Sequence, residues 1–505
     1  MKISVRELMD RSGVAFGTSG ARGLATAMTD QVCYAYTQGF LQYLVSVGEL
    51  KPTGDAVAVA GDFRPSTDRV MEAVCRAAED MGHRALLCGK IPSPAVALLG
   101  LEQKIPAIMV TGSHIPDDRN GIKFNKPSGE MLKEDERGMT GQTVAWPDSL
   151  FDVTGRFVPS SSSPRIVLDD ARKNYIARYL NVFDGNSLAG LRVGVYQHSS
   201  VGRDVLVEIL SRLGADVTPL GRSEKFLPVD TEAIRPEDVQ LARDWAATGR
   251  FDALVSADGD SDRPLISDER GEWLRGDVAG ILCARFLGAD SISTPVSCNT
   301  AVEKCGWFQS VRRTRIGSPY VIASMQEACR AGATRVVGYE ANGGFLLNTD
   351  VTLEGKLLRA LPTRDAVIVL LSILLTSNRR GKTLSQLVAE LPARFTASAR
   401  LENFPTESSR ALLASFSCGN ETADRAALER VFGTLCGTVS GIDRTDGLRA
   451  TFVSGEVLHL RPSGNAPEFR CYTEAATQER SAALNAAALN LLKRLPAEMG
   501  LGLIK

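Results

Sequence analysis

Short apolar runs alternate with longer stretches of helical periodicity along most of the chain. Residues 55–62, DAVAVAGD, predict a strand that ends in a polar loop, and residues 66–82 predict a helix closed by a glycine. Residues 84–89 and 106–112 predict two further strands. Strands and helices that alternate at this spacing are typical of parallel α/β layers, whose functional loops lie at the strand ends.

The same alternation returns in two later stretches of the chain. Their predicted elements are a strand at 191–198, a helix at 201–215, a strand at 252–260, a strand at 291–297, a helix at 318–332 and a strand at 335–344. After Pro392 several strands follow one another closely, which predicts a smaller α+β domain. The serine-rich residues 158–164 predict a linker.

These breaks divide a chain of 505 residues, which is long enough for three to four domains of roughly 150 residues each. We expect four domains, at residues 1–157, 165–289, 290–392 and 393–505. The fold class that follows is α/β for the first three domains, with a smaller α+β domain at the C-terminal end.

Composition narrows the classes of function. Hydrophobic residues make up 44% and charged residues 23%, the proportions of a soluble globular protein. With 58 basic and 59 acidic side chains the net charge is -1, which argues against nucleic acid or an anionic membrane as a partner. Ten cysteines without a CxxC pair predict buried free thiols in a reducing compartment. The N-terminal residues lack a signal-peptide core, and the longest apolar run, 366–376, is too short to span a bilayer, so we expect a cytoplasmic protein.

The first loop with candidate chemistry is 111–116, TGSHIP, directly after a predicted strand. Ser113 stands among small residues at the strand end, where it can approach a ligand closely. His114 is its neighbour, and Lys123 follows close enough to fold back over it. A plain turn, in which serine and glycine satisfy backbone groups, is the alternative interpretation of this loop.

The second loop is 258–263, DGDSDR, which follows another predicted strand. Asp258, Asp260 and Asp262 alternate on a tight turn and can converge on one hard cation. Solvated turn acids are the alternative. A calcium EF-hand is a competing interpretation, which is disfavoured because its sixth position is Arg263 instead of glycine, although Glu269 falls at its twelfth. The arginine suits a phosphate that sits beside the metal.

Two glycine-containing loops carry groups for a sugar phosphate. In 338–344, GYEANGG, the side chains of Glu340 and Asn342 suit a pair of sugar hydroxyls. In 461–468, RPSGNAPE, backbone N–H groups, a hydroxyl and an arginine suit a phosphate. An ordinary turn is the alternative for each loop.

Two further stretches add support near the N-terminus. Residues 16–23, FGTSGARG, form a glycine-rich loop with one cation, Arg22, and no strand is evident before it. Residues 61–66, GDFRPS, end a strand and are placed to brace the serine loop.

The order of these loops along nearly the whole chain resembles the α-D-phosphohexomutase superfamily, which includes phosphoglucomutases, phosphomannomutases and phosphoglucosamine mutases. TGSHIP is similar to the family's TASHNP, DGDSDR to DGDGDR, YEANGG to GExSGH, and RPSG is the same in both. The resemblance implies four domains around a central cleft, three related α/β domains with mixed sheets and a smaller last one. It also implies Mg²⁺ as cofactor, with glucose- or mannose-1,6-bisphosphate as the primer that phosphorylates the serine.

The resemblance also implies roles for individual residues. The expected catalytic residues are Ser113, His114, Lys123 and Arg22, and the expected metal ligands are Ser113, Asp258, Asp260 and Asp262. The expected substrate-binding residues are Arg263, Arg315, Ser318, Glu340, Asn342, Arg461, Ser463, Gly464, Asn465 and Arg470. A hexose phosphate would be phosphorylated by phosphoserine 113, and the serine would then take back the phosphate from the other position of the bisphosphorylated sugar.

Several positions depart from the family pattern and leave the sugar open. Gly344 stands where many members have a histidine, and Asn342 replaces a serine. Arg315 and Ser318 fall where some glucose- and mannose-active members have lysine and histidine. We expect an isomerase, a phosphomannomutase or phosphoglucomutase, with a phosphoglucosamine or phospho-N-acetylglucosamine mutase as the alternative. A phosphatase and a catalytically weak sugar-phosphate binding protein are the rival functions, and a monomer or dimer is expected.

Overall fold

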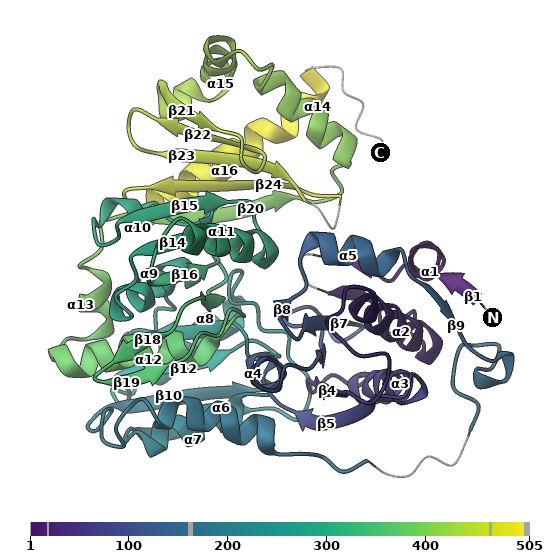
Figure 1. Ribbon diagram of the computed structural model, residues 1–505. Helices are drawn as coiled ribbons and strands as arrows, with labels where there is room; N and C mark the ends of the chain where they lie inside the picture. Colours follow the sequence, from purple (N-terminus) through teal and green to yellow (C-terminus); the bar gives the residue numbers. More distant parts are fainter. Residues whose placement is uncertain (1, 18–19, 160–164, 464–466, 499–505) are drawn as a thin grey trace. The chain divides into compact units, whose positions relative to one another are not determined.

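The computed structural model describes residues 2–17, 20–159, 165–463 and 467–498 (Figure 1). Contacts within the chain divide it into two compact units. The first unit comprises residues 1–292 and 317–387, and the second comprises 293–316 and 388–505. Two predicted substrate-binding residues, Gly464 and Asn465, lie outside the described residues, as does most of the predicted linker.

The N-terminal part of the first unit is built on a mixed sheet with the strand order β2-β3-β7-β6-β4-β5. Strand β4 (Ala56–Gly61) lies next to the edge strand β5 (Arg84–Lys90) and pairs in parallel with β5 and with β6 (Ala107–Val110). The antiparallel strands are β7 (Arg119–Lys126), β3 (Ala21–Leu24) and β2 (Ala15–Phe16), with β8 (Gly129–Glu130) paired to the end of β7. The serine loop therefore leaves β6 at its C-terminal end, where ligands bind in open α/β sheets.

Helices bury both the sheet and one another in this part. α2 (Asp30–Ser46) is buried along most of its length and packs on α3 (Thr67–Asp80), whose apolar face completes the core. Thr29 caps α2 by accepting a hydrogen bond from the backbone N–H of Val32. The other elements are β1 (Lys2–Ser4), α1 (Val5–Ser12), α4 (Ser93–Gln103), α5 (Lys133–Thr140), β9 (Thr143–Ala145) and a 3-10 turn (Asp148–Leu150).

A second mixed sheet follows, with the order β11-β10-β12-β13. Strands β11 (Asp216–Arg222), β10 (Arg192–His198) and β12 (Ala253–Ala257) run parallel, and β13 (Pro264–Ser267) runs antiparallel to β12. The acidic loop is thus the hairpin between β12 and β13, which is not the helix–loop–helix of an EF-hand. The helices of this part are α6 (Asp170–Leu180), α7 (Arg203–Arg212) and α8 (Pro236–Ala246).

The third part supplies the loop with Glu340, which connects β16 (Val336–Tyr339) to the antiparallel β17 (Phe345–Leu347). α9 (Gly276–Phe286) and α11 (Ser318–Arg330) pack against β16, and α12 (Ala366–Arg380) packs against α9. The apolar run predicted at 366–376 is therefore a core helix. Also present are β14 (Ser291–Pro295), the β18 (Val351–Leu353) and β19 (Lys356–Leu358) hairpin, and α13 (Leu384–Val388).

The second unit contains a fully antiparallel sheet with the order β20-β24-β23-β22-β21. Its strands are β20 (Phe395–Leu401), β21 (Val439–Asp443), β22 (Leu448–Phe452), β23 (Val457–Pro462) and β24 (Phe469–Ala475). Helices α14 (Thr406–Phe416), α15 (Glu421–Cys436) and α16 (Gln478–Glu498) share one apolar core with this sheet. α10 (Ala301–Lys304) and β15 (Ser310–Thr314) complete the unit.

The predicted fold class is confirmed: parts with mixed sheets and helices are followed by a smaller α+β part with an antiparallel sheet. The helices predicted at 66–82, 201–215 and 318–332 are present with slightly shorter bounds. The expectation that no strand precedes the Arg22 loop was wrong, because β2 pairs with β3 across it; two residues are too few to give a readable pattern. None of the helices among the described residues is both long and apolar enough to cross a membrane.

Candidate active site

The serine loop has a strained backbone that its surroundings hold in place. Ser113 is fully buried and has a φ of 57°, in the left-handed region that costs a non-glycine residue about 1 kcal/mol or more. Its N–H donates to Thr111 Oγ1 at 2.7 Å, and its carbonyl accepts from Arg64 Nη2 at 2.8 Å. Thr111 Oγ1 in turn donates to Asp62 Oδ2 at 2.7 Å. Both peptide groups of the serine are therefore fixed.

Arg64 holds the whole loop from within. Beyond Ser113, its guanidinium donates to the carbonyls of Ile115 (2.5 Å), Pro116 (2.6 Å) and Arg119 (3.0 Å). A Cβ on Gly112 would lie 2.6 Å from the Arg64 Cζ, so glycine is required where the guanidinium passes. The segment 61–66 therefore braces the serine loop, as the sequence suggests.

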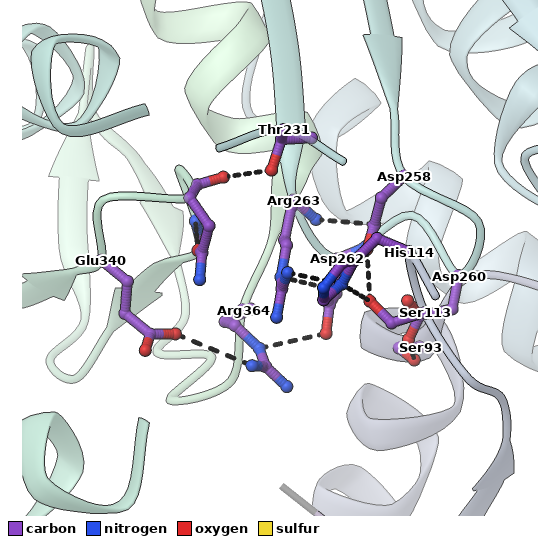
Figure 2. A network of polar contacts seen from close by, with 12 residues as sticks. Ser93, Ser113, His114, Thr231, Asp258, Asp260, Asp262, Arg263, Glu340 and Arg364 are labelled. Carbon is purple, nitrogen blue, oxygen red and sulfur yellow. Dashed lines mark hydrogen bonds and ion pairs between the residues drawn. The ribbon is translucent and has the colours of Figure 1, made fainter. Parts of the chain in front are cut away.

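The hydroxyl of Ser113 points at the three aspartates (Figure 2). Ser113 Oγ donates to Asp258 Oδ2 at 2.5 Å, and carboxylate oxygens of Asp258, Asp260 and Asp262 lie within 4.8 Å of one another. All three side chains are buried. Burial, followed by the charges of Asp260 and Asp262, raises the pKa of Asp258 to about 8. Such a concentration of carboxylates needs a compensating cation.

Lys123 supplies part of that compensation. It lies on β7 opposite Met109 of β6, and its Nζ donates to one oxygen each of Asp260 and Asp262, both at 2.5 Å. Burial acts to raise the pKa of Asp260, but the charge and hydrogen bond of Lys123 outweigh it and hold that pKa well below its usual range. Ser93, at the start of α4, also donates to Asp260.

Burial and the neighbouring Arg263 set the protonation state of His114. Arg263 Nη1 donates to His114 Nδ1 at 2.8 Å, so this nitrogen carries no proton. Burial, with the charge of Arg263, lowers the pKa of His114 to about 3. Ser113 Oγ lies 3.4 Å from the same nitrogen. His114 is therefore a neutral neighbour of the serine, with Nδ1 already engaged by Arg263.

Arg22 lies on β3 opposite Gly121 and is half-buried. Burial, followed by the charges of Arg263 and Arg364, lowers the pKa of Arg22 to about 10, so it remains a cation at neutral pH. Asp260 and Asp262 are close enough to oppose that shift. The site thus gathers several cations around its buried carboxylates.

The loop with Glu340 lies on the other side of Arg364 (Figure 2). Glu340 is 4% exposed, and burial raises the pKa of its carboxyl. Asn342 uses its side-chain carbonyl to accept from the Gly344 N–H at 2.9 Å, and its backbone carbonyl accepts from Thr231 Oγ1 at 2.6 Å. Asn342 therefore shapes the loop that carries Glu340, and its contact with substrate stays a prediction.

The remaining predicted substrate residues lie elsewhere on the chain. Ser318, at the start of α11 in the first unit, donates to Glu130 Oε2 at 3.1 Å. In the second unit Arg461 on β23 lies directly opposite Arg470 on β24, and the N–H of the buried Ser463 donates to the Glu468 carbonyl at 2.8 Å. The Arg315 Nε in that unit donates to the Thr445 carbonyl at 3.2 Å. That these second-unit residues serve the site at Ser113 stays a prediction.

Sequence reasoning missed three residues that complete the site. Arg364 forms an ion pair with Asp262, and Ser93 and Thr231 hold the acidic and Glu340 loops as described above. The detectable signal belongs to the neighbour of Arg364, since Asp365 stands directly before an apolar helix, where an aspartate typically caps the first turn. Ser93 and Thr231 are ordinary residues in sequence and become informative only in three dimensions.

Four domain families match consecutive stretches of the chain. They are the phosphoglucomutase/phosphomannomutase alpha/beta/alpha domain I at residues 13–143, domain II at 173–271, domain III at 275–395 and the C-terminal domain at 416–491.

Whole proteins match over the same extent. A phosphomannomutase of Salmonella muenchen is 42% identical over 94% of this chain and 94% of its own. A phosphomannomutase of Sinorhizobium fredii is 44% identical over 95% of this chain and 99% of its own. A phosphoglucosamine mutase of Sorangium cellulosum is 29% identical over 95% of this chain and 92% of its own. Among solved structures, a phosphoglucomutase/phosphomannomutase family protein of Burkholderia thailandensis matches with a TM-score of 0.69 at 19% identity. The match covers 94% of this chain and 96% of that protein's chain.

Proposed function

This chain belongs to the phosphoglucomutase/phosphomannomutase family, and we propose that it interconverts mannose 6-phosphate and mannose 1-phosphate through a phosphorylated Ser113. One observation carries the proposal: the Ser113 hydroxyl donates to Asp258 at 2.5 Å within a buried cluster of three carboxylates. The choice of mannose is supported by the names of the relatives at 42% and 44% identity, against 29% for the phosphoglucosamine mutase.

The residues present fit a divalent metal. Three carboxylates converge, and Asp260 Oδ1 and Asp262 Oδ1 are buried without a hydrogen-bond partner among the described residues. Hard oxygen ligands of this kind suit Mg²⁺. We propose that Asp258, Asp260, Asp262 and the phosphoserine would hold it. When bound, the ion would withdraw negative charge from the phosphoryl group during its transfer.

The chain's own groups would do the rest of the work of the transfer. Ser113 Oγ carries the phosphoryl group, and its fixed backbone holds that oxygen in one direction. Arg263 and Lys123, both buried beside the serine loop, balance the charge of the phosphoryl oxygens. Because Ser113 and the aspartates are buried, water is kept from the phosphoserine, which favours transfer to a sugar over hydrolysis.

Glu340 is the proposed acceptor for sugar hydroxyls. Its carboxyl is buried, its Oε2 has no hydrogen bond within the described part of the chain, and burial raises its pKa. A carboxylate in this state can accept from two hydroxyls or take up a proton as the acceptor oxygen is phosphorylated. Arg22 stays a cation near the acceptor, Lys123 is paired there with Asp260 and Asp262, and His114 keeps Arg263 in place.

The non-reacting phosphate would be held by the second unit. We assign this role to Arg461, Ser463 and Arg470, with Gly464, Asn465 and Arg315 as further contacts, and Ser318 and Asn342 as contacts from the first unit. Support comes from the direct pairing of Arg461 with Arg470 across neighbouring strands, which brings two guanidinium groups to one end of the sheet.

Finer points of the proposal follow from the same reasoning. Mannose- or glucose-1,6-bisphosphate is the proposed primer of the phosphoserine. The chain divides into the four proposed domains, 1–157, 165–289, 290–392 and 393–505, which is supported by the four consecutive family matches. A cytoplasmic monomer or dimer is proposed, and the ten free cysteines support a reducing compartment.

A coupled mutase assay with mannose 1-phosphate, Mg²⁺ and a bisphosphate primer tests the proposal. Ser113→Ala should lose nearly all activity while its unfolding midpoint stays close to the wild-type value. Ser128→Ala, an exposed serine of the same part of the chain, should keep full activity. Intact-mass analysis should find a phosphoryl group on the wild type and none on Ser113→Ala.

Full turnover by Ser113→Ala would overturn the phosphoserine route. Faster release of inorganic phosphate than of the isomer would instead identify a phosphatase. A higher kcat/KM with glucose, glucosamine or N-acetylglucosamine phosphate than with mannose phosphate would reassign the sugar. Binding of each sugar phosphate without any turnover would identify a binding protein.

A further inference from the structure

Arg364 stands between two parts of the proposed site that come from different sheets (Figure 2). Its Nε lies 3.0 Å from Asp262 Oδ2, and its Nη1 lies 3.7 Å from Glu340 Oε2. We propose that Arg364 is a positioning residue that fixes the sugar-binding carboxylate Glu340 relative to the metal-binding loop. This inference rests on the proposed function, because it assigns a task within that same site.

The surroundings of Arg364 are suited to a fixed cation. Its side chain is 4% exposed, and it borders a cavity together with Lys123, Glu130 and Asp262. Burial acts to lower its pKa, but the charges of Asp262, Glu130 and Glu340 outweigh this and keep the guanidinium protonated. Because a planar guanidinium presents several N–H groups in a rigid fork, it can hold two carboxylates at a set separation, which the single ammonium of a lysine cannot.

The backbone that carries Arg364 is anchored from another helix. The next residue, Asp365, caps α12 through the Val367 N–H and accepts from the hydroxyls of Tyr175 and Tyr179 on α6. All three side chains are buried. A charged residue whose neighbour is held by two tyrosines has little freedom to follow its partners, so the partners must adjust to it.

Gly344 leaves the room that Arg364 needs. A Cβ at Gly344 would lie 2.6 Å from Arg364 Cδ and 2.8 Å from its Cγ, distances that real Cβ atoms do not show. A side chain at residue 344 and the present arrangement of Arg364 are therefore mutually exclusive. This accounts for the departure at Gly344, since the space beside this loop is occupied by Arg364 in place of a side chain from the loop itself.

The experiment compares Arg364→Met, Arg364→Lys, Gly344→Ala and the double variant Gly344→Ala/Arg364→Met. The matched control is Arg359→Met, an exposed arginine of the same segment. Two readouts are collected for each protein. The first is kcat and KM for mannose 1-phosphate, and the second is the rise in unfolding temperature caused by mannose 1-phosphate without turnover, in the absence of primer.

Arg364→Met should raise KM by about tenfold or more, because Asp262 and Glu340 would lose the shared ion-pair partner that sets their separation. Arg364→Lys should restore part of this loss. Gly344→Ala should resemble Arg364→Met, and the double variant should be no worse than Arg364→Met, because both changes disturb one contact. The sugar phosphate should raise the unfolding temperature less in each variant than in the wild type.

A purely structural role gives a different pattern, because a smaller folded fraction lowers apparent kcat and leaves KM unchanged. That pattern would overturn the inference. So would a KM of Arg364→Met within twofold of the wild-type value, or strictly additive effects in the double variant. The proposed function fails separately, if the wild type binds mannose 1-phosphate but does not isomerise it. The temperature shifts would still test the placement of Glu340 in that case.

Discussion

Gly259 and the carbonyl oxygen of Ser113 lie in direct contact, although 146 positions separate them in the sequence, and a Cβ on Gly259 would stand 2.7 Å from that oxygen. Gly259 is also the residue between Asp258 and Asp260, so the acidic loop and the serine loop meet backbone to backbone. The approach of the hydroxyl to the carboxylates therefore depends on the absence of a side chain at this residue.

Gly259→Ala should push the two loops apart and lower mutase activity by about a hundredfold, because a displacement of about 1 Å at a reacting group has that effect. Gly441→Ala is the matched control, since a Cβ built there would have no atom of the described residues within 4 Å apart from its own chain neighbours. Its activity and stability should equal those of the wild type. An active Gly259→Ala enzyme would mean that the contact between the loops is not needed for catalysis.

Arg64→Met should destabilise the protein by about 3 kcal/mol or more, because removing one partner of a buried ion pair leaves the other charge uncompensated. Asp62 would lose that partner, and the carbonyls of the serine loop would lose their donor. The free energy of unfolding in urea measures the effect. Activity measured where the variant is still folded should fall as well, because Ser113 is no longer held.

Arg11→Met is the control for this substitution. Arg11 pairs with Glu7 one helical turn away on an exposed face, and such pairs contribute about 0.5 kcal/mol or less. Equal losses of stability in Arg11→Met and Arg64→Met would contradict the bracing role of Arg64.

Removal of divalent cations with EDTA should abolish turnover, and added Mg²⁺ should restore it, because three buried carboxylates converge beside Ser113. Asp260→Asn should raise the Mg²⁺ concentration for half-maximal activity by about tenfold or more. Asp184→Asn, which changes an exposed aspartate paired with Lys356, should leave that concentration unchanged. Full activity in EDTA would exclude the metal from the mechanism.

Stability should fall as the pH is lowered from about 6.5 to about 4. Burial lowers the pKa of both His198 and His459 to about 4, whereas an unfolded histidine has a pKa of about 6.5. Below pH 6.5 the unfolded chain therefore binds protons that the native chain does not, and the native state loses stability until its own pKa is reached. The contribution of His459 is about 3 kcal/mol over this range.

Urea unfolding of the wild type and His459→Gln at several pH values tests this expectation. His459 Nε2 donates to the Asp446 carbonyl at 2.6 Å, a bond that a glutamine amide can replace without titrating. The variant should therefore lose less stability than the wild type between pH 6.5 and 4. If the free energy of unfolding changed with pH by the same amount in both proteins, His459 would not be the titrating group.

The sequence predicts the elements of this fold well where apolar runs are long and bounded by glycine or polar residues. β4 and α3 are examples, since one is a continuous buried run and the other has a single apolar face. It fails at β2, where two residues form a strand only because β3 lies beside them. The local sequence pattern contains no information about such pairings.

The residues of the candidate site also fall into those that the local sequence predicts and those that it does not. Ser113 and the aspartates are predictable because their residue types and spacing already specify a chemistry. Arg364 and Ser93 are not, because each acts through a partner far away in the sequence, Asp262 for one and Asp260 for the other. For Arg315 the family position points to substrate, and its Nε donates to the Thr445 carbonyl; its role toward the substrate stays a prediction.

The left-handed backbone of Ser113 has a consequence for protein engineering. Its amide is held by Thr111 and its carbonyl by Arg64. Arg64 is in turn paired with Asp62, and it fits only because Gly112 has no side chain. The hexapeptide TGSHIP is thus not a portable module. Transplanted into a different scaffold without the preceding strand-end residues, it would relax to an ordinary turn, and its hydroxyl would no longer be aimed at anything.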